Sequence, residues 1–294
     1  MAGVTAPIFS RTSQYRLAAP LLLGGCAPGV LDPAGPVGVG DRLVLLNSLA
    51  IMLAIVVPTI LATLAFAWWF RAGNTRAEYR PDFAYSGRLE LLVWSIPALV
   101  VIFLGGVAWI GSHDLDPSQP LASKVAPIRV DVVALDWKWL FVYPDQGIAS
   151  INRVVAPVGV PVSFRITSAT VMNSLFVPQL GGQIYAMAGM ETKLHLQADK
   201  PGSYRGLSAH YSGKGFPGMT FRMDAVSPEQ FAGWVAGAKA GGPVLDRAGY
   251  LALLKDSEDV KPYTYRAVPP GLFDAVVKDS GTLSAKRAKD GRQQ

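Results

Sequence analysis

The sequence contains one cysteine, Cys26, among 294 residues, and only 16% of its residues are charged. A single cysteine excludes an internal disulfide and any Cys-rich zinc or iron–sulfur site. The charged fraction lies well below the roughly one quarter found in ordinary soluble domains, whereas half of the residues are hydrophobic. These shortages argue against a disordered or nucleic-acid-binding protein and favour a chain with membrane spans.

The formal net charge of +6 is not gathered on one folded region. Residues 71–88 carry four arginines, and residues 278–294 hold five basic and two acidic residues. A nucleic-acid groove needs Lys and Arg clustered on a fold, so no nucleic-acid partner is expected. We expect residues 281–294 to form a disordered basic tail.

The first 25 residues have the pattern of an export signal. Two arginines precede a short apolar run, which leads into Leu23-Gly24-Gly25-Cys26. A positive region, a short apolar core and small residues before a cleavage site define such signals. The tetrapeptide looks like a bacterial lipobox, in which the cysteine is acylated and becomes the new N-terminus. The alternative is a chance cysteine in a signal region.

Residues 43–112 predict a transmembrane helical hairpin. Leu43–Phe70 has no charge over 28 residues, and Leu91–Ile110 has none over 20. At about 1.5 Å per residue, each run covers a hydrocarbon core of roughly 30 Å. Two buried helices of a soluble protein are the alternative, which these lengths disfavour.

The loops orient this hairpin. The four arginines of residues 71–88 place that loop in the cytoplasm, because positive residues favour the cytoplasmic side. Residues 26–42 and everything after residue 112 then face the periplasm. The lipobox independently requires an external N-terminus, so the two signals agree.

Residues 125–225 change to a period of two, typical of half-buried strands. In residues 128–134, for example, apolar side chains alternate with Arg129 and Asp131. Such strands, separated by Pro/Gly turns, indicate an antiparallel sandwich. Residues 226–280 then predict short helices, at Phe231–Lys239, Asp246–Lys255 and Leu272–Lys278. The first follows a capping-box pattern that starts at Ser227.

Together these features resemble subunit II of the haem–copper terminal oxidases, in the ubiquinol oxidase branch of the cytochrome bo type. The similarity runs from about Cys26 to residue 278. The segments that carry it are Leu135–Trp139 (LDWKW), Val171–Ser174 (VMNS), Gln183–Met190 (QIYAMAGM) and Tyr211–Met219 (YSGKGFPGM). The resemblance implies a membrane-anchored chain: a helical hairpin, an all-β cupredoxin-like sandwich, and short C-terminal helices.

In the cytochrome c oxidase branch, the sandwich holds a two-copper centre bridged by cysteine thiolates. By resemblance, its ligand positions are here Asn173, Ser208, Ser212, Phe216 and Met219, with His210 between the two serines. Soft thiolates are needed for such a centre, and of these residues only Met219 matches the ligand set. We therefore expect no metal or other cofactor in this chain.

The other candidate residues are two histidines and two tryptophans. His195 on the polar face of its strand and His113 at the end of the second span are expected to be ordinary histidines. Trp137 and Trp139 are expected to pack at the interface with the catalytic subunit, since bulky aromatics are common interface anchors. In the copper-bearing branch, the same region lies near the path of electron entry.

Glu90 opens the second span at its cytoplasmic end. One interpretation is a carboxylate favoured by the positive end of the helix dipole. The resemblance implies another, in which Glu90 stands at the mouth of a proton channel of the catalytic subunit. Carboxylates at the edge of a membrane serve such roles, and the residues alone leave both interpretations open.

The resemblance implies the accessory subunit of a proton-pumping ubiquinol oxidase in a bacterial inner membrane. Haems and one copper would belong to the catalytic subunit I, which would be its partner together with smaller membrane subunits. The complex would oxidise ubiquinol and reduce oxygen to water. The alternatives are a cytochrome c oxidase subunit, disfavoured by the altered ligand positions, and a free-standing lipoprotein with a binding or sensing sandwich.

Overall fold

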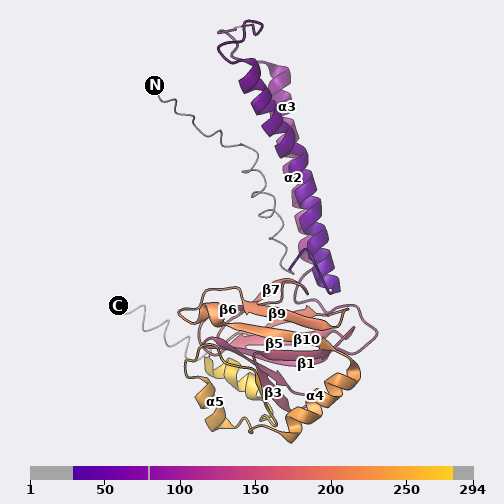
Figure 1. Ribbon diagram of the computed structural model, residues 1–294, viewed down its shortest axis with the longest axis vertical. Helices are drawn as coiled ribbons and strands as arrows, with labels where there is room; N and C mark the ends of the chain where they lie inside the picture. The colour runs from indigo at the N-terminus through magenta and orange to yellow at the C-terminus, as the bar shows by residue number, and fades with distance from the viewer. Residues whose placement is uncertain (1–28, 79, 281–294) are drawn as a thin grey trace, which may run out of the picture.

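The computed structural model describes residues 29–78 and 80–280. The predicted signal at residues 1–25, the lipid-attachment residue Cys26 and the predicted tail at residues 281–294 lie outside the described residues. Within these ranges the chain forms a long helical hairpin joined to a β-sandwich with short helices (Figure 1).

The hairpin consists of α2 (Pro36–Trp69) and α3 (Gly87–Asp114), which run side by side (Figure 1). Both helices are long and apolar enough to cross a membrane. Near the sandwich the two helices approach closely because Gly40 of α2 has no side chain. A side chain on Gly40 would start 2.5 Å from Leu115, which follows α3. α2 begins before its predicted span, and α3 extends beyond its predicted span at both ends, because helical hydrogen bonding continues outside the apolar runs.

The start of α2 is inserted into the sandwich. Ala34 donates its backbone N–H to Gln179 at 2.8 Å and accepts one from Asp199 at 2.8 Å. A side chain on Gly35 would lie 1.9 Å from the backbone oxygen of Gln197, so only glycine permits this approach. The hairpin is therefore fastened to the sandwich by backbone contacts.

The expected β-sandwich is confirmed, and within the described residues it has two sheets. The first contains, in order, β11 (Tyr263–Tyr265), β3 (Ile148–Ile151), β2 (Lys138–Tyr143), β1 (Ile128–Leu135), β5 (Val162–Ser168) and β8 (Thr192–Leu196). The second contains β4 (Arg153–Pro157), β10 (Thr220–Val226), β9 (Gly202–Ser208), β6 (Asn173–Phe176) and β7 (Gln183–Ala186).

The prediction that all pairing is antiparallel is wrong. β1 pairs with β5 in parallel, and β4 pairs with β10 in parallel. The second pair arises where the chain leaves one sheet for the other at Asn152, which has a φ of 53°. Its side chain accepts from Trp139 N and donates to Val260 O, both at 2.8 Å. Alternation along a strand shows which face is buried but not the direction of the neighbouring strand.

The first sheet is buried on both faces, which the alternating pattern did not predict. One apolar cluster fills the space between the sheets, and a second lies on the opposite face of β1 and β2. That second cluster includes Leu245, Leu253, Phe273 and Val276 from the C-terminal segment. As a result Asp131, which we expected on a solvent-exposed face, is only 6% exposed.

The C-terminal segment contains the predicted helices and one strand that was missed. α4 (Pro228–Ala240) begins with the expected capping box between Ser227 and Gln230. α5 (Arg247–Leu253) and a helix over residues 272–280 follow. Between them lies β11, whose three residues pair with β3. A strand of three residues is too short to show a clear period of two. It forms because its backbone pairs with β3 at the edge of the sheet.

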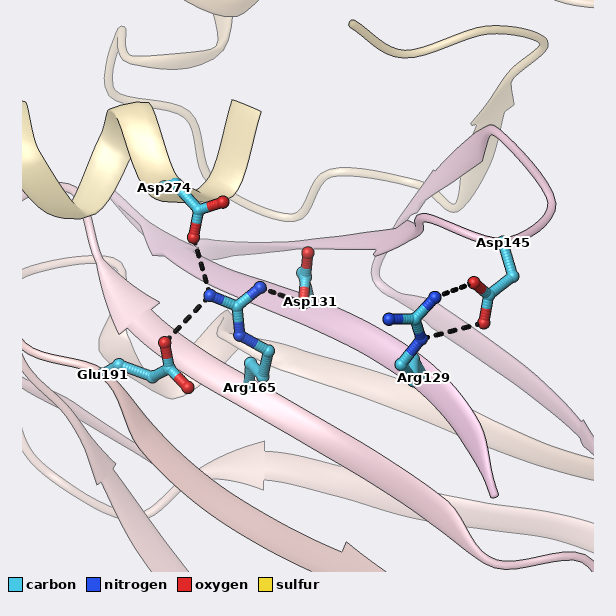
Figure 2. A network of polar contacts seen from close by, with 6 residues as sticks. All are labelled: Arg129, Asp131, Asp145, Arg165, Glu191 and Asp274. Carbon is cyan, nitrogen blue, oxygen red and sulfur yellow. Dashed lines mark hydrogen bonds and ion pairs between the residues drawn. The ribbon is translucent and has the colours of Figure 1, made fainter. Parts of the chain in front are cut away.

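Arg165 on β5 joins the last helix to the sandwich (Figure 2). Its guanidinium lies 2.9 Å from Glu191 and 2.6 Å from Asp274, and it stacks 4.5 Å from the centre of the Phe273 ring. Asp131 approaches the same guanidinium at 3.6 Å, but its Oδ1 atom has no hydrogen-bond partner. Burial raises the pKa of Asp131 to about 6, and Arg165 opposes this rise only in part.

Asp131→Asn is expected to stabilise the protein above pH 6. Because the pKa of Asp131 is higher in the folded chain than in the unfolded chain, folding binds a proton between about pH 4 and pH 6, and stability falls as pH rises through this interval. The substitution removes this cost, which is of the order of 1–3 kcal/mol at neutral pH. Denaturant unfolding of the detergent-solubilised chain across this pH range measures it.

The matched control is Asp145→Asn. Arg129 pairs with Asp145 and lowers the pKa of that carboxyl, which is largely exposed. Loss of this ion pair is expected to destabilise the protein slightly at neutral pH, which is the opposite of the effect expected for Asp131→Asn. An Asp131→Asn variant that unfolds more easily than the parent at neutral pH would contradict the assignment.

Candidate functional site

The candidate site lies at the end of the second sheet where β6 begins and β9 ends. Asn173 is the first residue of β6, Ser208 is the last of β9, and Met219 immediately precedes β10. β6 and β9 pair with Leu175 opposite Ser208. The pairing of these strands brings the ligand positions predicted from the sequence to one end of the sandwich.

Three of these positions meet in a closed, hydrogen-bonded arrangement. Ser208 Oγ donates to Asn173 Oδ1 at 3.1 Å, and Ser208 N donates to Met219 O at 3.1 Å. The exposed fractions are 1% for Asn173, 3% for Ser208 and 1% for Met219. Buried polar groups need such partners, and here the amide and the hydroxyl satisfy each other.

The other two positions, Ser212 and Phe216, lie on the loop between β9 and β10. Trp137 supports this loop: its Nε1 donates to Ser212 O at 3.0 Å. Gly215 lies so close to the indole that a side chain there would start 2.4 Å from the ring. The Phe216 ring packs against Tyr211, with centroids 5.6 Å apart. The loop is thus held by aromatic packing.

The remaining histidines do not complete a metal site. The ring of His210 packs edge-on against Tyr185 at 5.9 Å, and within residues 29–78 and 80–280 no group of three or more His, Cys, Asp or Glu residues is arranged to hold a metal. His195 is 8% exposed rather than on a polar face, because the linker after α3 covers it: His195 N donates to Pro117 O at 3.1 Å. Burial lowers the pKa of this ring, which favours its neutral form.

The donor set at the site does not fit a two-copper centre. It offers one amide, two hydroxyls, one phenyl ring and one thioether, from Asn173, Ser208, Ser212, Phe216 and Met219. A serine hydroxyl does not ionise as a thiolate does near neutral pH, and bridging copper requires soft thiolate sulfur. Hydrogen bonds within the protein occupy the polar atoms of Asn173 and Ser208.

The interface prediction is wrong for Trp139. Its side chain is fully buried between the sheets, 5.9 Å from the Phe221 ring, and it offers no surface to a partner. Trp137 is only partly buried. Exposed apolar side chains that the sequence analysis did not single out lie at the same end of the second sheet, where β6 begins. This apolar rim consists of Val171, Met172, Tyr185, Met190 and Tyr211, with exposed fractions of 45%, 37%, 45%, 53% and 73%.

The sequence carried only an indirect sign of this rim. Its residues lie in segments already noted for their resemblance, but periodicity does not show where a loop side chain points.

Glu90 lies far from the rim, in the first turn of α3 at the end of the hairpin remote from the sandwich (Figure 1). Its side chain is exposed, and its N–H donates to Ser86 O at 3.0 Å.

Comparison with known proteins agrees with this architecture. Residues 146–226 match the family model of the cytochrome c oxidase subunit II periplasmic domain, and residues 239–279 match that of the COX aromatic-rich motif. Among solved structures, the periplasmic domain of subunit II of cytochrome oxidase from Bradyrhizobium japonicum aligns with 40% of this chain and 98% of its own, at 25% identity and a TM-score of 0.38. The two family models, together with the hairpin and the sandwich, point to the class of subunit II of the terminal oxidases.

Full-length relatives narrow this class. The chain is 48% identical to cytochrome bo(3) ubiquinol oxidase subunit 2 of Pseudomonas aeruginosa, over 92% of this chain and 81% of the relative. It is also 48% identical to ubiquinol oxidase subunit 2 of Acetobacter aceti, over 89% of this chain and 85% of the relative. The chain belongs to the family of subunit II of cytochrome bo(3) ubiquinol oxidase.

The two serines at the site are expected to differ in their contribution to stability. Ser208→Ala leaves the buried Asn173 Oδ1 without its hydroxyl donor and is expected to cost about 1–3 kcal/mol. Ser212→Ala removes a buried hydroxyl that has no hydrogen-bond partner, so a change within about 0.5 kcal/mol is expected. Parallel denaturant titrations of both variants measure the difference. Equal losses would show that the Ser208–Asn173 contact does not hold the site closed.

Proposed function

We propose that this chain is the non-redox subunit of a proton-pumping ubiquinol oxidase in a bacterial inner membrane. The complex oxidises ubiquinol, reduces oxygen to water and moves protons outward. Haems, one copper and the quinol site belong to the catalytic subunit I. The observation that carries this proposal is the closed Asn173–Ser208–Met219 arrangement, which supplies no thiolate at the ligand positions.

The electron donor, ubiquinol, explains why this chain can work without an electron-transfer centre of its own. Ubiquinol is lipid-soluble and reaches subunit I through the membrane, so its electrons do not need to pass through a periplasmic domain. A sandwich without an electron-transfer centre then needs no docking site for a soluble cytochrome. Its task is to anchor and stabilise the catalytic subunit.

The hairpin and the apolar rim support this task. The strands of the sandwich lie across the axis of the hairpin, so the domain extends sideways from it (Figure 1). Gln179 and Leu180, which bind the start of α2, follow β6, whereas the rim surrounds the opposite end of that strand. Exposed apolar patches mark interaction sites. We place the rim and Trp137 against the outer face of subunit I, beside the hairpin.

Two further assignments complete the arrangement. Acylation of Cys26 would add a lipid anchor on the periplasmic side. The arginine-rich loop between α2 and α3 would lie in the cytoplasm, since basic loops favour that side. The smaller membrane subunits of the oxidase are further partners in this assembly.

The detergent-purified complex tests the proposal. Ubiquinol is expected to support oxygen consumption and reduced cytochrome c is not, and metal analysis is expected to find a single copper for each copy of this chain. Extra copper that stays with this chain after subunit I is removed would contradict the non-redox assignment. Purification of this chain without a haem-bearing partner would point to a free-standing lipoprotein.

Glu90 is proposed to collect protons at the mouth of a channel of subunit I. Its exposed position at the cytoplasmic end of α3 supports this role, because a carboxylate there meets water and the membrane surface. Glu90→Gln is expected to slow turnover and proton uptake roughly several-fold without loss of the complex. Proton uptake by reconstituted vesicles measures this effect.

The matched control is Glu78→Gln in the loop between α2 and α3, at the same end of the hairpin as Glu90. Glu78 is paired with Arg80 and largely exposed, so its substitution is expected to leave turnover unchanged. Normal uptake in Glu90→Gln, or equal slowing in both variants, would leave only the helix-dipole interpretation of Glu90.

A further inference from the structure

Three arginines stand side by side on the outer face of the second sheet. Arg222 on β10 is the register partner of Arg153 on β4 and also of Arg205 on β9. Residues in register on adjacent strands point to the same face. Their neighbours Val154 and Met223 are 0% and 1% exposed and point inward. The three guanidinium groups therefore form one row on the solvent-exposed face.

The chain neutralises only one end of this row. Arg153 Nε lies 2.7 Å from Asp224 Oδ2, whereas Arg222 donates to the Ser203 hydroxyl at 3.3 Å. Over residues 29–78 and 80–280, neither Arg205 nor Arg222 forms an ion pair. Like charges directly opposite each other destabilise a strand pair. A bound anion would relieve this repulsion.

The row lies in a groove that also has aromatic walls. One cavity of about 360 Å³ is lined by Arg205 and Arg222, and the next, of about 330 Å³, by Trp234 and Tyr263. Pro262 lines both, so the two cavities adjoin each other. Asp259 also lines the first cavity, which still leaves one more positive than negative charge there. The groove combines Arg, Trp and Tyr, the residue types that dominate protein–protein hot spots.

The shape and position of the groove favour a polypeptide over a small anion or a lipid. Adjacent strands lie about 4.8 Å apart, so the row extends for about 10 Å, which exceeds one phosphate group and suits successive carboxylates. In the second sheet β4 is the edge strand opposite β7. The hairpin meets the sandwich near β7, whereas α4, which carries Trp234, lies on the far side (Figure 1). The groove thus lies toward the edge of the second sheet that is remote from the hairpin.

We propose that this groove is a docking site for an acidic polypeptide segment of a partner protein on the outer side of the membrane. Carboxylates of the segment pair with Arg205 and Arg222, and an apolar side chain beside them packs against Pro262 and Tyr263. The site is separate from the apolar rim, so it does not depend on how the sandwich meets subunit I.

The test uses the purified oxidase complex in nanodiscs. The probe is a fluorescein-labelled peptide of alternating glutamate and tyrosine, and the reference probe has glutamine at each glutamate. Fluorescence anisotropy is expected to show saturable binding of the acidic probe only, weakened by added salt. The double variant Arg205→Gln/Arg222→Gln is expected to lower the affinity about tenfold or more.

The matched control is Arg247→Gln, an exposed arginine at the start of α5 and outside the groove; it is expected to bind the acidic probe as the parent does. Unchanged ubiquinol oxidation by the double variant shows that the complex is intact. The proposal is overturned if the glutamine probe binds equally or if the double variant retains full affinity. Displacement of the peptide by millimolar inorganic phosphate would instead identify a small-anion site, and preferential binding of anionic lipid vesicles would identify a membrane contact.

Discussion

The backbone junction between α2 and the sandwich is the constraint on which the arrangement of this molecule depends. Ala34 exchanges hydrogen bonds with Gln179 and Asp199, and the missing side chain of Gly35 allows the chain to pass against Gln197. A flexible linker would let a membrane-anchored domain take many orientations. Here the hairpin holds the sandwich with its strands across the helix axis, and this orientation decides which end reaches a neighbouring subunit.

At the end of the sandwich where β6 begins, hydrogen bonds and aromatic packing hold the residues whose positions, by resemblance, carry metal ligands in the copper-bearing branch. Asn173 and Ser208 satisfy each other inside the sheet, and Trp137 supports the following loop through Ser212 and Gly215. The buried polar groups of Asn173 and Ser208 have hydrogen-bond partners within the chain, as buried polar groups need. The exposed surface of this end is then free to serve as a contact.

Much of this could be predicted from the sequence because the signals are local. Uninterrupted apolar runs identify the hairpin, and a period of two identifies the strands. The predictions that failed concern residues whose surroundings come from segments distant in the sequence. Asp131 has the position of an exposed residue in its strand, yet the C-terminal segment covers that face. Trp139 was placed at an interface and lies in the core, because β2 is covered on both sides.

The sequence by itself determined that the chain has two apolar spans and a sandwich, because hydropathy and periodicity are local properties. The resemblance to the oxidase family identified the positions of the copper ligands, at which the sequence has no cysteine. The tertiary structure decided what each position does. It joined Ser208 and Asn173 by a buried hydrogen bond, gathered the apolar rim from three loops and β7, and aligned Arg153, Arg222 and Arg205 across three strands. Strand pairing between distant segments produces these arrangements, and no local pattern records it.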